Sequence, residues 1–108
     1  MTAGFAESTN LAQAQGLDLN AFGQALGVGP LASPYSKLKV SKMLSQDWSA
    51  QVAIKDCYNS TQLIESASNA PKSQSPLLQL CGSLYGKANQ SGFGEEDMIA
   101  VGKVLEKL

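Results

Sequence analysis

The sequence predicts an all-α protein of about six helices, and three observations support this fold class. Apolar residues recur at the spacing of helix faces, whereas no stretch alternates apolar and polar residues as a strand would. Two Ser-Pro pairs, Ser33–Pro34 and Ser75–Pro76, have the residue types that begin helices. The chain has 108 residues, which suits one hydrophobic core, so residues 1–108 are expected to form a single helical domain.

The first two expected helices lie before the first Ser-Pro pair. A stretch rich in Ala and Gln, from about Thr2 to Gln15, favours helix and is followed by Gly16, a common C-terminal stop. This helical pattern is already under way at Met1, as in a longer helix that has been cut. Asp18 is placed to cap a second, short helix, in which one face is formed by Leu19, Phe22 and Leu26.

The third helix is expected to begin near Pro34 and to be followed by a loop, Ser45 to Ser49, that holds the tryptophan Trp48. Its lysines have no aromatic residues between them, so the default expectation is a solvated face, with the steering of anions as a minor alternative. These lysines are Lys37, Lys39 and Lys42.

Three further helices are expected in the second half. The longest helical pattern runs from about Ala50 to Asn69, and the next helix begins near Pro76. The core face of that next helix is predicted to comprise Leu77, Cys81, Leu84 and Ala88. The last helix is expected to open with three acids that favour a helix N-terminus, Glu95, Glu96 and Asp97. Its predicted core face comprises Met98, Val101, Leu105 and Leu108.

Composition excludes several classes of function. The chain has no arginine and no histidine, which excludes Ser-His-Asp triads, Cys-His dyads and HExxH zinc helices. Its net charge of −1 argues against a nucleic-acid partner. We expect no membrane partner and a cytoplasmic location, because no leader peptide or apolar run of about 20 residues is visible. Cys57 and Cys81 are expected to be free buried thiols, although a single disulfide between two packed helices remains open.

Three features could carry chemistry, and each has a simpler structural explanation. Lys55–Asp56, near the start of the long helix, could reach over a ligand or form a solvated surface pair. Trp48 could be a ligand wall or a plug at the edge of the core. The cluster of acids at 95–97 could hold a metal, but its place at a helix start explains it better, so no metal site is predicted.

A set of motifs along the chain gives a resemblance to a known family. The motifs, in order, are Leu11-Ala-Gln-Ala-Gln-Gly-Leu-Asp18, Asp47-Trp48, Val52-Ala-Ile-Lys-Asp56, Ser75-Pro-Leu77 and Gly92-Phe-Gly-Glu-Glu-Asp97. Together they resemble the C-terminal helical domain of the β-hydroxyacid dehydrogenases, which include 3-hydroxyisobutyrate dehydrogenase and are related to 6-phosphogluconate dehydrogenase. The resemblance covers essentially the whole chain.

The resemblance implies a domain that normally follows a Rossmann domain and covers its NAD or NADP. In the family the lysine matched by Lys55 faces the cofactor, and the aromatic residue before it is matched by Trp48. The family's catalytic lysine would precede Met1, so no catalytic residue is predicted in this chain, and no cofactor is expected to bind it alone. Cys57 and Tyr58 follow the Lys-Asp pair where the family usually has an aliphatic residue.

These expectations lead to two candidate functions. The first is a non-catalytic helical domain that self-associates, most simply as a homodimer. The contact would use the faces of the first helices that would otherwise cover a Rossmann domain, to which Phe5 and Phe22 could contribute. The second is half of an oxidoreductase that acts on a small hydroxy acid together with a separate Rossmann-domain partner. A DNA-binding helical regulator is a weaker third interpretation.

Overall fold

A computed structural model of the chain describes residues 1–30, 32–69 and 74–107. Within these ranges the secondary structure is helical, and the only β-type contact is an isolated antiparallel bridge between Ala53 and Asp97. The elements are α1 (Thr2–Ala14), α2 (Leu19–Val28), α3 (Pro34–Ser45), α4 (Ile54–Asn69), α5 (Pro76–Ala88), the π-helix η1 (Asn89–Phe93), the 3-10 helix η2 (Met98–Ala100) and α6 (Val101–Leu105). The predicted all-α fold with six α-helices is confirmed in the described part of the chain.

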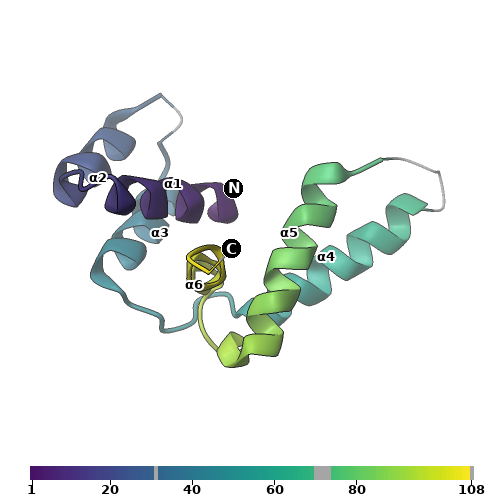
Figure 1. Cartoon of the computed structure of the whole chain (residues 1–108). Coiled ribbons are helices and arrows are strands. Elements are labelled where there is room, and N and C mark those ends of the chain that lie inside the picture. The colour runs from purple at the N-terminus through teal and green to yellow at the C-terminus, as the bar shows by residue number, and fades with distance from the viewer. Residues whose placement is uncertain (31, 70–73, 108) are drawn as a thin grey trace.

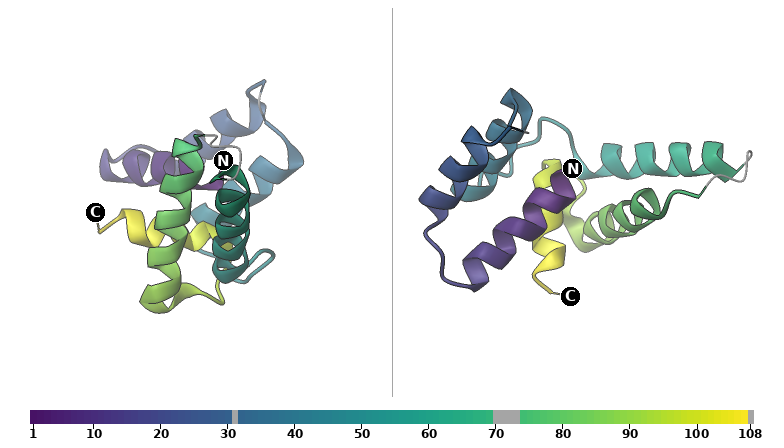
Figure 2. Two further views of the ribbon diagram at one scale, coloured as in Figure 1. Left: turned by 90° about the vertical axis from the view of Figure 1, so that its right-hand side faces the viewer. Right: turned by 90° about the horizontal axis from the view of Figure 1, so that it is seen from above.

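The helices form two groups with α6 between them (Figure 1). α1, α2 and α3 pack together on one side, and α4 and α5 form a helical hairpin on the other. α6 contacts both α1 and α5 and therefore joins the two groups. The α4–α5 hairpin extends away from the remaining helices, as the right-hand view of Figure 2 shows.

Local capping explains where two of the helices begin. The Asp18 carboxylate accepts hydrogen bonds from the backbone N–H groups of Asn20 and Ala21, as expected for the residue that caps α2. Ser33 and Ser36 form a reciprocal capping box at the start of α3, each side chain accepting from the other's backbone N–H. Both starts were predicted because a cap is defined by residues within four positions of one another.

The core lies where α1, α5 and α6 meet. Small residues allow close approach: Ala6 on α1, Ala88 on α5 and Ala100 at the end of η2 are almost fully buried. A Cβ on Gly102 would lie 3.6 Å from that of Ala6, so α6 packs closely against α1. Larger core side chains include Met43, Ile54, Leu84, Tyr85, Ile99, Val101 and Val104.

Several predicted boundaries and faces are wrong. α4 begins at Ile54, not near Ala50, because the backbone groups before and at its start are hydrogen-bonded to the segment 94–98. Leu77 is not part of a core face: it lies in the first turn of α5 and is 78% exposed. Phe5 packs against the core cluster, and Phe22 is half-buried on α2, which has no fully buried residue.

The predicted last helix also needs correction. Glu95 and Glu96 precede the helical segment, which begins with η2 at Met98 and continues as α6. Asp97 caps η2, but its carboxylate is fully buried, so it does not belong to a solvated acidic cluster. Val101 and Leu105 face the core cluster as expected, whereas Leu108 lies outside the described residues.

None of the helices in the described ranges combines the length and the apolar character needed to cross a bilayer.

Candidate functional site

The residues singled out by the sequence meet along a strip that we call the seam, formed by residues 47–55 and 94–98. The two segments run side by side and are joined by backbone hydrogen bonds. These bonds are Asp97 N to Trp48 O at 2.9 Å, Met98 N to Val52 O at 2.7 Å, Ile54 N to Glu96 O at 2.9 Å and Lys55 N to Gly94 O at 3.0 Å. Trp48 and Lys55 therefore both belong to the seam, as does the acidic segment.

Trp48 is half-buried and packs against the core, so its position agrees with a plug at the core edge. Its ring is also occupied by a cation from this chain. The Lys103 ammonium lies 4.2 Å from the centre of the Trp48 ring and 4.8 Å from that of Phe93, and it forms an ion pair with Glu96 at 2.8 Å. One face of the indole is therefore taken by Lys103.

Lys55 stands in the first turn of α4 with its side chain about half exposed. Its ammonium donates to the Glu95 carboxylate at 2.7 Å. It does not donate to the neighbouring Asp56, as a solvated Lys55–Asp56 surface pair would. The hydrogen bond with Glu95, with the attraction of that charge, raises the pKa of Lys55 above its ordinary value. Lys55 is a permanent, accessible cation at the end of the seam.

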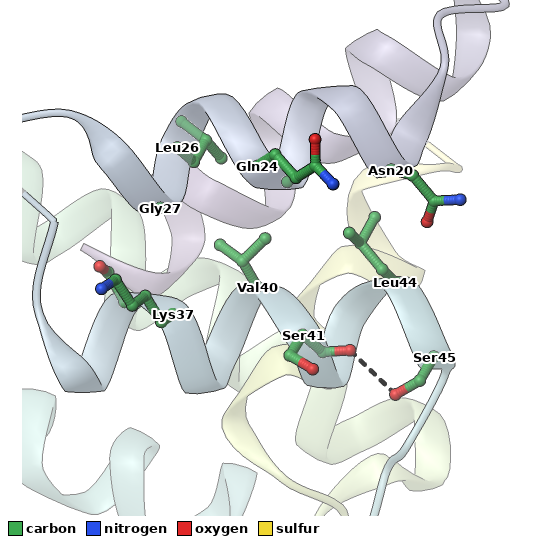
Figure 3. A pocket seen from close by; sticks show the side chains of 11 residues that line it. Asn20, Gln24, Leu26, Gly27, Lys37, Val40, Ser41, Leu44 and Ser45 are labelled. Atoms are coloured by element: carbon green, nitrogen blue, oxygen red, sulfur yellow. Dashed lines mark hydrogen bonds between the residues drawn. The ribbon is translucent and has the colours of Figure 1, made fainter.

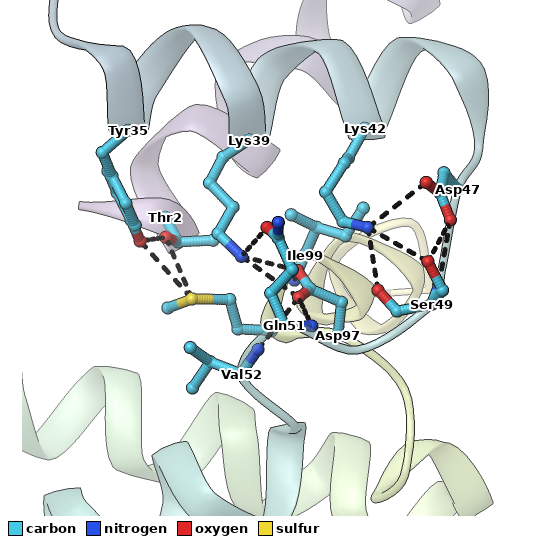
Figure 4. Close-up of polar contacts among 11 residues, drawn as sticks. Thr2, Tyr35, Lys39, Lys42, Asp47, Ser49, Gln51, Val52, Asp97 and Ile99 are labelled. Atoms are coloured by element: carbon cyan, nitrogen blue, oxygen red, sulfur yellow. Dashed lines mark hydrogen bonds and ion pairs between the residues drawn. The ribbon is translucent and has the colours of Figure 1, made fainter.

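Sequence reasoning missed the group at the centre of the seam, the buried ion pair of Lys39 and Asp97 (Figure 4). The Lys39 ammonium lies 3.1 Å from both carboxylate oxygens and 3.4 Å from the Gln51 amide oxygen. Asp97 also accepts from the backbone N–H groups of Gln51 (2.8 Å), Val52 (3.2 Å) and Ile99 (3.2 Å). The side chains of Lys39 and Asp97 are 2% and 0% exposed.

The environment of Asp97 sets its protonation state. Burial alone would raise its pKa, but the backbone N–H groups of Gln51, Ile99 and Val52 and the ammonium of Lys39 outweigh burial. The pKa of Asp97 therefore lies below its ordinary value, and the carboxylate is charged at neutral pH. The pair fixes α3 to the seam and presents no free proton donor or acceptor to solvent.

The solvated lysine face predicted for α3 is wrong for two of its three members. Lys39 is buried in the ion pair just described, and Lys42 is buried with its ammonium donating to the Ser49 carbonyl at 2.8 Å and paired with Asp47 at 3.4 Å. Only Lys37 is exposed as expected. A missed signal was available: Lys39 follows Ser36 by three residues and precedes Met43 by four, which places all three on one helix face.

Nucleophilic side chains near the core are not activated. Burial raises the pKa of the Cys57 thiol, and burial is also the main cause of the raised pKa of the Tyr85 hydroxyl. Both cysteines are free and half-buried. Among the described residues, no group of Cys, Asp and Glu side chains is arranged to hold a metal ion.

A groove of about 630 Å³ runs between α2 and α3 (Figure 3). Leu26, Val40 and Leu44 form its apolar part, while polar side chains such as Gln24 and Ser41 line the remainder. Gly23 allows the two helices to approach, since a Cβ there would meet the Leu44 side chain at 2.7 Å. Neither Trp48 nor Lys55 lines this groove.

Comparison with known proteins identifies the architecture. No family model matches the chain, and no curated protein matches it in sequence. Among solved structures, the crystal structure of 3-hydroxyisobutyrate dehydrogenase from Salmonella typhimurium matches 95% of this chain with a TM-score of 0.89 at 21% sequence identity. The chain spans 36% of the length of that dehydrogenase. The resemblance predicted from the motifs is thus confirmed at the level of the fold: the chain has the same fold as a helical part of that dehydrogenase.

Proposed function

We propose that this protein is a non-catalytic, self-associating helical domain with the architecture of the cofactor-capping and oligomerisation domain of an NAD(P)-dependent β-hydroxyacid dehydrogenase. The observation that carries this proposal is the fold match to about a third of a dehydrogenase chain. In this proposal residues 1–108 act as one domain in the cytoplasm, where its two free thiols would stay reduced. The nearly balanced charge gives no reason to propose a nucleic-acid partner.

The non-catalytic role is supported by what the polar groups of the seam already do. Lys39 and Asp97 neutralise each other, and the ammonium of Lys103 is held by Glu96 and two aromatic rings. Hydride transfer requires a bound cofactor and a general acid or base close to the substrate hydroxyl. With its buried charges paired, the seam supports structure better than proton transfer.

Self-association is supported by exposed apolar surface. The α4–α5 hairpin carries four large aliphatic side chains that are more than half exposed: Leu63, Ile64, Leu77 and Leu80. Such side chains favour a partner surface, and a two-fold dimer is the commonest closed arrangement. We propose that the hairpin contributes to the dimer contact.

Light scattering coupled to gel filtration tests this role. We expect a dimer at micromolar concentration and a shift toward monomer in Leu77→Lys, because a charge would be buried in the contact. Val28→Lys on α2 is the matched control, since Val28 is also highly exposed but lies outside the hairpin. A wild-type protein that is monomeric at these concentrations contradicts the proposal, and so does an equal effect of both variants.

A second candidate is supported by Lys55. Its accessible ammonium could contact a dinucleotide supplied on a separate Rossmann-domain partner, with Trp48 forming part of the wall behind it. The fit is incomplete on this chain alone, because Lys103 covers one face of the Trp48 ring and Glu95 holds the Lys55 ammonium. The cofactor, when bound, would supply the hydride chemistry for a small hydroxy acid.

Calorimetric titration with NAD and with NADP separates the two candidates. The non-catalytic role predicts no binding to the chain alone and no change in the dinucleotide affinity of a Rossmann-domain partner when the chain is added. The oxidoreductase role predicts that adding the chain tightens that affinity, and that Lys55→Gln reduces the effect. Lys37→Gln is the control, because Lys37 is an exposed lysine of α3 outside the seam.

A further inference from the structure

A second concave site, distinct from the α2–α3 groove, lies where the end of α5, η1 and α6 meet. Its volume is about 320 Å³. In Figure 1 this region is at the light-green end of α5, next to the yellow α6. Three of the eight lysines of the chain line it: Lys87 from α5, Lys103 from α6 and Lys107 just after α6. We call it the lysine pocket.

The charges in the lysine pocket are not balanced. Lys103 is paired with Glu96, with two nitrogen-to-oxygen contacts of 2.8 and 2.9 Å. Neither Lys87 nor Lys107 forms an ion pair with a residue in the described part of the chain. Two uncompensated ammonium groups at one concave site repel each other, and the field between them favours an anion.

The remaining lining residues offer both an apolar wall and hydrogen-bonding groups. Phe93 is half-buried, and one side of its ring carries the Lys103 ammonium at 4.8 Å, which holds ring and cation together. Gln90 and Ser91, on η1, place an amide and a hydroxyl at the rim. Gly92 follows with φ of +94°, so the chain turns sharply and keeps Ser91 and Phe93 on the same pocket.

We propose that the lysine pocket binds a phosphate monoester of a small organic molecule. The phosphoryl group lies among Lys87, Lys103 and Lys107, and the organic part packs against Phe93. A phosphate monoester carries nearly two negative charges at neutral pH, which matches the two uncompensated lysines, and its three terminal oxygens accept from three ammonium groups. The pocket volume is at the lower end of the range for small-molecule sites. This proposal does not depend on the dimer or on the dinucleotide.

NMR titration of the full chain tests the proposal with phenyl phosphate, inorganic phosphate and phenol as probes. We expect phenyl phosphate to bind with a Kd of about 1 mM or tighter and to shift the amide signals of Ser91 and Phe93. Inorganic phosphate should bind more weakly, because it lacks the apolar part, and phenol should not saturate. Equal affinity for inorganic phosphate and phenyl phosphate overturns the assignment to an ester.

Substitutions locate the site. Lys87→Gln and Lys107→Gln should each weaken phenyl phosphate binding roughly 3- to 10-fold, as expected for the loss of one partly exposed charge contact. Lys37→Gln removes the same charge from the distant α3 and should leave the affinity unchanged. A Kd weaker than about 10 mM at about 0.15 M salt, or an equal loss in Lys37→Gln, overturns the proposal in favour of diffuse attraction to lysines.

Discussion

The buried Lys39–Asp97 pair predicts a strong asymmetry between two substitutions. Asp97→Asn changes one oxygen to an amide nitrogen and keeps the side-chain shape. If the amide oxygen stays at the Oδ1 position, it still accepts from Gln51 and Val52, but the new NH₂ then faces the N–H of Ile99 at 3.2 Å and the Lys39 ammonium at 3.1 Å. The Ile99 N–H and the Lys39 ammonium, which donated to a charged oxygen, then face another donor.

The magnitude follows from these contacts. Leaving a buried cation without its counter-charge costs about 3–5 kcal/mol, so Asp97→Asn should lower the free energy of unfolding by that amount. Lys39→Met removes the cation and one ammonium donor, but the carboxylate keeps three backbone donors. We expect it to cost about 1.5–3 kcal/mol, the worth of hydrogen bonds to a charged group. The double variant should cost less than the sum, since no charge then remains buried alone.

Equilibrium urea unfolding at neutral pH measures these differences, with circular dichroism for the helices and the fluorescence of Trp48 for the seam. Glu7→Gln, an exposed acid of α1, is the control and should change stability by less than about 0.5 kcal/mol. The reasoning is refuted if Asp97→Asn stays within about 1 kcal/mol of the wild type, or if Lys39→Met is the more damaging change.

Two further predictions concern pH and packing. The pKa of Asp97 is lower in the folded protein than the unfolded value of about 3.9, so its stabilisation is present above that value and is lost as the pH falls through the folded pKa. The free energy of unfolding should therefore fall more steeply with acid in the wild type than in Asp97→Asn. Parallel curves would contradict this. Gly86→Ala should lower the thermal midpoint by the equivalent of about 1–3 kcal/mol, because its Cβ would lie 2.9 Å from the Tyr58 ring. Gly4→Ala, whose Cβ would have nothing within 4 Å, should raise the midpoint by the equivalent of about 0.5–1 kcal/mol. A shift of the same sign in both would count against the packing described.

The sequence alone predicted those features that depend on residues close together in the chain. Asp18 and Ser33 were identified as caps because each interacts with residues two or three positions away. The resemblance also predicted the fold, since its motifs are spread in order along the whole chain. The predicted start of the long helix near Ala50 was wrong because the Ile54 N–H donates to the distant Glu96 carbonyl, and the helix begins only at Ile54.

The site was predicted less well because its partners are distant in sequence. Lys55 and Trp48 were found from the motifs, but Glu95 and Lys103, which occupy them, lie 40 or more positions away. A lysine on a helix is normally assigned to solvent, so Lys39 was misplaced. The shared helix face with Ser36 and Met43 was a hint of burial, but the partner of Lys39 is an acid 58 positions later, and no local pattern identifies that partner.

The separation of 58 positions between Lys39 and Asp97 also bears on when α3 can dock during synthesis. At translation speeds of about 5–20 residues per second, Lys39 is added to the chain roughly 3–12 s before its counter-charge. Until then the ammonium group of Lys39 stays hydrated, which opposes early collapse of the nascent chain onto this face of α3. The final docking of α3 therefore waits until Asp97 and the neighbouring residues of the seam have been synthesised.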